Sequence, residues 1–226
     1  MNEKNHSWGS FIFLRRLEMK KPLEQRFNSC EVRAVQNDSG SLITGMPIVF
    51  ESKTDLGLFD EVIRVGALDG TDLTDVRFLV NHNTDMIPLA RSRRNNGNST
   101  MQLTTTAEGL QMEATIDTEN NNTAKELKSA IDRKDISGMS FMFSVAEDEW
   151  EDLDSDHPTR YITKIASVVE VSAVTFPAYD ATSINARSKD ALESARAAVE
   201  TAKRSVETES NLLELEKAKT LILGGF

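Results

Sequence analysis

A serine in an alternating segment is the best-placed nucleophile of this chain. Met139, Phe141 and Phe143 alternate with Ser140, so a strand here would turn apolar side chains toward a core and the Ser140 hydroxyl to the opposite face. A strand holds a side-chain oxygen in a fixed position, which suits a nucleophile. The same pattern also fits a half-buried serine without a chemical role, and both interpretations stand on this segment alone.

His82 and Glu170 are the residues that could activate such a serine. His82 follows the apolar run 76–80, and an imidazole fixed at a strand end can serve as a general base, although many such histidines are structural. Glu170 lies in the apolar run 168–174, where a carboxylate needs either solvent or a partner. That partner is either a histidine, which a carboxylate can orient, or an arginine such as Arg91.

Metal and cofactor chemistry finds little support in the sequence. Residues 152–156 begin like a calcium loop, but His157 and Thr163 stand where such a loop needs glycine and glutamate. No glycine-rich phosphate loop occurs. Cys30 is the single cysteine, which excludes internal disulfides and cysteine-rich zinc sites. We therefore expect no cofactor and no metal, and we interpret the acidic run as a solvated hairpin tip.

The composition is that of a globular chain with an acidic balance. The 226 residues allow one domain of moderate size with tails. The formal net charge of −10 argues against a protein that binds nucleic acid through phosphate contacts. No apolar run is long enough to span a membrane, and the N-terminal segment is a poor fit to a secretory signal.

Short alternating segments separated by turn residues predict a β-rich α+β domain, a barrel or a sandwich. One helix is predicted after Asn120, where Ala124, Leu127 and Ile131 recur at helical spacing, and it leads directly into the Ser140 strand. The predicted strands cover residues 27–35, 41–50, 59–68, 76–80, 88–92, 101–106, 110–116, 139–145, 161–165 and 168–174.

Three regions are predicted. Residues 1–25 are expected to form a flexible tail and residues 26–187 the domain. Residues 188–226 carry a narrow apolar stripe at alternating three- and four-residue spacing, which predicts a helical tail. That helix either packs on the body of the protein or docks a partner, a second copy included.

Several segments, in order, resemble the prohead maturation proteases of tailed bacteriophages with Hong Kong-type capsids. Those proteases are similar in fold to herpesvirus assemblins. The family usually has glycine at the positions of Met142 and Ala90. The matching segments are residues 27–29, 43–45, 58–63, 66–68, 79–83, 88–91, 135–141 and 170–178.

The resemblance implies a β-barrel-like core of short, mostly antiparallel strands with surrounding helices and a serine protease activity. By position, Ser140 matches the nucleophile, His82 the base and Glu170 the third member of the site, with Arg91 a weaker candidate to assist at the oxyanion. The implied substrate is the scaffolding segment of the major capsid protein, together with the protease itself. The implied location is the assembling prohead in the host cytoplasm. The alternative is an inactive assembly module that acts through its C-terminal helix.

Overall fold

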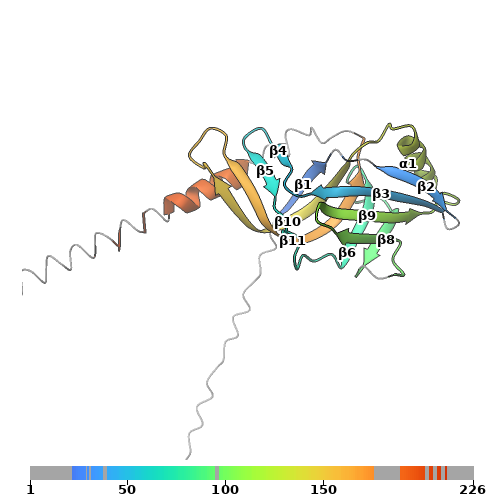
Figure 1. Cartoon of the computed structure of the whole chain (residues 1–226), viewed down its shortest axis with the longest axis horizontal. Coiled ribbons are helices and arrows are strands. Elements are labelled where there is room, and N and C mark those ends of the chain that lie inside the picture. The colour runs from blue at the N-terminus through green and yellow to red at the C-terminus, as the bar shows by residue number, and fades with distance from the viewer. Residues whose placement is uncertain are drawn as a thin grey trace, which may run out of the picture.

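The computed structural model describes residues 22–175, apart from 29, 31, 38–39 and 95–96. It also describes residues 189–201 and five isolated positions further on. Most of the predicted N-terminal tail, and most of the predicted C-terminal helix beyond residue 201, lie outside the described residues. The described chain forms two β-sheets with one helix at their side and a second helix near the C-terminus (Figure 1).

The strands divide between a seven-stranded and a four-stranded sheet, and each ladder joins strands of one sheet only. The larger sheet contains β1 (Leu23–Asn28), β10 (Met139–Glu151), β11 (Thr159–Ala173), β5 (Asp60–Ile63) and β4 (Lys53–Asp55) in that order, with β6 (Asp75–Val80) on β11 and β7 (Ala90–Arg93) on β6. The smaller sheet has the order β2 (Arg33–Asn37), β3 (Gly40–Val49), β9 (Gly109–Ile116) and β8 (Met101–Thr105).

One hydrophobic core lies between the two sheets. Phe141 and Phe143 of β10 are buried there with Ile43 of β3 and Met112 of β9. Alternation therefore turns the apolar face of β10 inward, as predicted, and leaves Ser140 on the other face.

The predicted internal helix is confirmed as α1 (Asn122–Asp132). Asn121 caps it, because its side-chain oxygen accepts a hydrogen bond from the backbone amide of Ala124. Leu127 and Ile131 form its buried face, so α1 packs beside the sheets and delivers the chain to β10.

The α+β class is confirmed, but three strand predictions are wrong. The segment 59–68 is a strand only over β5, because the chain turns over residues 65–70, with Gly66 at a φ of 86°. The segment 27–35 is not one strand, because β1 pairs in the larger sheet and β2 in the smaller one. The segments 161–165 and 168–174 are not two strands, because β11 runs through both. β1 also begins at Leu23, inside the predicted tail. Closure into a barrel stays a prediction, since the described strands form two separate sheets.

Residues 189–201 are helical and contact the body of the protein. Leu192 is buried against Leu56 and Phe59, and Arg196 donates hydrogen bonds to the carbonyls of Leu153 and Ser155. This part of the C-terminal segment therefore packs on the domain, as one of the two predicted alternatives has it. Among the described residues, no helix is long and apolar enough to cross a membrane.

A buried cluster of ion pairs binds β1 to the rest of the larger sheet. Arg26 binds both carboxylate oxygens of Glu61, at 2.5 and 2.7 Å. Arg160 binds Glu61, Glu24 and Asp148 at 3.1, 2.9 and 2.6 Å. Burial would raise the pKa of Glu24, but the neighbouring Arg26 and Arg160 outweigh it and lower that pKa, so the carboxylate stays charged.

We predict that Arg160→Ala lowers the free energy of unfolding by about 3 kcal/mol, because it leaves buried carboxylates without their counter-ion. Urea titration would measure the change. The control is Lys164→Ala, which removes an exposed ion pair with Glu147 and should cost less than about 1 kcal/mol. Equal losses in the two variants would contradict the importance of the buried cluster.

Candidate active site

The register of β11 brings the three predicted residues to one place. β11 pairs antiparallel with β10, with Ser172 opposite Ser140, and parallel with β6, with Ser172 opposite Leu79. Residues that are register partners point to the same face of a sheet. Ser140 and Glu170 therefore lie on one face, and the end of β6 carries the chain to His82 beside them.

His82 sits in a tight turn with an uncommon backbone conformation. Asn81 and His82 have φ values of 51° and 55°, in the left-handed region that residues other than glycine seldom adopt. The end of β11 stabilises the turn: the amide of Asn81 donates to the carbonyl of Ala173, and the Asn81 side-chain oxygen accepts from the amide and hydroxyl of Thr175. These hydrogen bonds fix the turn from which the imidazole projects.

The three side chains form a continuous chain of hydrogen bonds. Nε2 of His82 lies 2.5 Å from Oγ of Ser140, and Nδ1 of His82 lies 2.5 Å from Oε1 of Glu170. The side chain of His82 is 14% exposed and that of Glu170 only 3%. A buried carboxylate next to an imidazole favours the tautomer that carries a proton on Nδ1, so Nε2 faces the serine as an acceptor.

Ser172 is a member of the site that sequence reasoning missed. Its hydroxyl donates to Oε2 of Glu170 at 2.6 Å and accepts from the backbone amide of His82 at 3.1 Å. It thus satisfies the second oxygen of the buried carboxylate and ties the His82 turn to β11. The available signal was its position two residues after Glu170, on the same face of the strand.

Arg91 lies two strands from Glu170 in the larger sheet, because it pairs with Arg77 of β6, and Arg77 pairs with Glu170. Its guanidinium binds the carboxylate of Asp75 at 2.5 and 2.8 Å, and this hydrogen bond lowers the pKa of Asp75. Glu170 takes His82 and Ser172 as its partners rather than Arg91. A role of Arg91 at the oxyanion stays a prediction.

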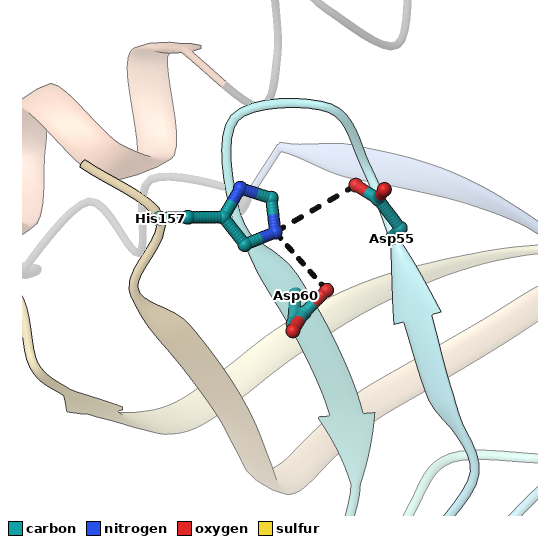
Figure 2. A group of neighbouring side chains, drawn as sticks. All are labelled: Asp55, Asp60 and His157. Carbon is teal, nitrogen blue, oxygen red and sulfur yellow. Dashed lines mark hydrogen bonds and ion pairs between the residues drawn. The ribbon is translucent and has the colours of Figure 1, made fainter. Parts of the chain in front are cut away.

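Asp55, Asp60 and His157 form a second cluster of polar side chains, at the opposite end of β11 from Glu170 (Figure 2). Thr159 and Glu170 are eleven positions apart on the extended strand, roughly 36 Å at the usual rise per residue. Nε2 of His157 lies 3.1 Å from Asp60 and 3.8 Å from Asp55.

The cluster is an ion-pair network rather than a prepared metal site. Lys53 binds the other oxygen of Asp60 at 2.9 Å, and this hydrogen bond, together with that of His157, lowers the pKa of Asp60. A metal ion would have to compete with the Lys53 ammonium for that carboxylate.

We predict that neither added Zn²⁺ nor a chelator shifts the melting temperature, because Lys53 already occupies the Asp60 carboxylate. An ion that bound the folded state would stabilise it by mass action and raise that temperature. Thermal unfolding with and without metal would measure this. A rise in melting temperature with Zn²⁺ that disappears in His157→Ala would contradict the prediction and establish a metal site at Asp55, Asp60 and His157.

Comparison with known proteins connects this geometry to a family. The model of the caudovirus prohead serine proteases matches residues 28–196. Among solved structures, the capsid assembly protease gp21 of bacteriophage T4 is similar, with 13% sequence identity and a TM-score of 0.43, covering 70% of this chain and 99% of that one. No curated protein matches. Since the family model covers well over half of its length, the chain belongs to the caudovirus prohead serine proteases.

Proposed function

We propose that the chain is a serine endopeptidase of capsid maturation, with Ser140 as its nucleophile, His82 as its general base and Glu170 as the residue that orients the imidazole. The hydrogen-bonded chain from Ser140 through His82 to Glu170 carries this proposal. The family match supports the reaction class, and the geometry supports the assignment of roles.

The reaction follows from the donors and acceptors of the site. Nε2 of His82 removes the hydroxyl proton as Oγ of Ser140 attacks the scissile carbonyl carbon. The resulting imidazolium is stabilised by the Glu170 carboxylate and gives its proton to the departing amine. Water then enters and attacks the acyl–serine ester while His82 removes one of its protons. The bond between Oγ and the acyl carbon breaks, the second product leaves as a carboxylic acid, and the imidazolium returns the proton to Oγ.

Burial of Glu170 strengthens the stabilisation that its charge gives to the His82 imidazolium. In surroundings of low dielectric constant, a carboxylate hydrogen-bonded to an imidazolium stabilises it more than the same pair would in water. Because Ser172 satisfies the remaining oxygen, Glu170 stays aligned with Nδ1 through the proton transfer.

The substrate that fits the family is the scaffolding segment of the major capsid protein, and the protease itself is a second substrate. Cleavage then takes place inside the assembling prohead in the host cytoplasm, where confinement raises the concentrations of enzyme and substrate. Self-association of the protease within the prohead belongs to the same proposal.

We predict that Ser140→Ala abolishes processing of a co-expressed capsid subunit and that Glu170→Gln lowers the rate by about 10⁴-fold. Gel mobility and intact mass of the capsid subunit would measure both effects. If the capsid subunit remains full length with the wild-type protein as well, the chain acts as an assembly module without protease activity.

We predict that Ser172→Ala lowers kcat about tenfold with KM unchanged, because the substitution loosens Glu170 and the His82 turn without touching the substrate. Ser172→Thr keeps the hydroxyl and should restore most of the rate. The matched control is Ser167→Ala, which removes a hydroxyl bonded to Ser144 on the same pair of strands. An equal loss in the Ser167 variant would show that the effect is structural.

A further inference from the structure

The nucleophile strand is covered on one side by the N-terminal strand. β1 is the edge strand of the larger sheet and pairs antiparallel with β10, with Phe27 opposite Ser140. Phe27 therefore lies on the same face as the serine. Its ring rests against Gly138, where a Cβ atom would come within 2.3 Å of it. Ser140 itself has no exposed surface.

A main-chain carbonyl of β1 competes with His82 for the serine proton. Oγ of Ser140 lies 2.8 Å from the carbonyl oxygen of Arg26 and 2.5 Å from Nε2 of His82. A hydroxyl has one proton to donate, and a carbonyl oxygen can only accept. When the proton points to Arg26, the Nε2 atom has no proton to remove and general-base catalysis cannot begin.

The same contact blocks the approach of a substrate. Attack requires a scissile carbonyl carbon about 3 Å from Oγ. With Ser140 fully buried and the Arg26 carbonyl at hydrogen-bond distance, that position is closed. The hydrogen-bonded chain of the site is therefore assembled but inaccessible.

We propose that β1 is an inhibitory strand that must leave the edge of β10 before Ser140 can react. The inference rests on the proposed function for its consequence in catalysis, but the movement of the strand is independent of it. Among the described strands, β1 pairs with β10 alone, and the next strand, β2, belongs to the other sheet. The chain can therefore release β1 while β2 keeps its place on β3.

The buried charge cluster can divide when β1 leaves. Arg26 and Glu24 both belong to β1 and bind one another at 2.5 Å, so they depart as a neutral pair. Arg160 remains behind with Glu61 and Asp148. Each guanidinium keeps a carboxylate partner, but Glu61 loses both of its bonds to Arg26 and the set that remains carries one negative charge in excess. This cost keeps β1 in place until something else stabilises the open state.

The first test measures access to position 140 without any catalysis. In a Cys30→Ala, Ser140→Cys variant, a small neutral alkylating reagent reports how often the buried thiol opens. Adding Phe27→Ala should raise the labelling rate about tenfold, equivalent to about 1.4 kcal/mol, since it removes a ring that holds β1 in place. The control is Leu103→Ala, which creates a cavity in the smaller sheet and should leave the rate unchanged.

The second test locks the strand. Gln25 and Met142 are register partners on β1 and β10, at a separation that a disulfide can bridge. In a Cys30→Ala background, Gln25→Cys/Met142→Cys should lose processing when oxidised and regain it on reduction. The control is Gln102→Cys/Glu113→Cys across β8 and β9, which should process equally well in both states.

Three outcomes decide the proposal. The proposal is overturned if the Ser140→Cys variant is labelled rapidly and Phe27→Ala does not change the rate. It is also overturned if the oxidised Gln25→Cys/Met142→Cys variant is fully active. Labelling that follows the prediction while neither wild-type nor reduced protein cleaves the capsid subunit supports the inhibitory strand and contradicts the protease function instead.

Discussion

The pairing of β11 with its two neighbours is the constraint on which the site depends. β11 presents Glu170 and Ser172 on one face while it binds β10 on one edge and β6 on the other. The side-chain period of a strand is two, so a slip of one residue in the β10 ladder would turn Ser140 away from Glu170. A slip in the β6 ladder would displace the turn that carries His82. The registers of the β10–β11 and β6–β11 ladders together therefore determine whether Ser140, His82 and Glu170 meet.

The alternation around Ser140 predicted both its strand and its face, and helical spacing predicted α1. Resemblance to a family, rather than spacing, joined Ser140 to His82 and Glu170. Strand partners were beyond reach, because alternation shows which face is apolar but not which strand lies alongside. The separation of β1 from β2 and the role of Ser172 follow from pairing alone, so neither was predicted.

β11 also connects the stability of the domain to the site. Near its start, Arg160 is buried in the charge cluster, and near its end Glu170 is buried against His82. Arg26 connects β1 to the cluster by its ion pair with Glu61, and its main-chain carbonyl accepts a hydrogen bond from the Ser140 hydroxyl. One residue thus contributes to the fold through its side chain and accepts a hydrogen bond from Ser140 through its main-chain carbonyl. Removing one partner of such a buried pair is costly because the other charge is then left without its counter-ion.

The proposed function requires that His82 make the Ser140 hydroxyl reactive. Prolonged treatment of the full-length protein with a fluorophosphonate, followed by peptide mapping, tests it most directly, because this reagent traps activated serines. The account predicts a single adduct on Ser140 that forms in the wild type and fails to form in His82→Ala. An adduct on another serine, or equal modification of Ser140 without the imidazole, would contradict it.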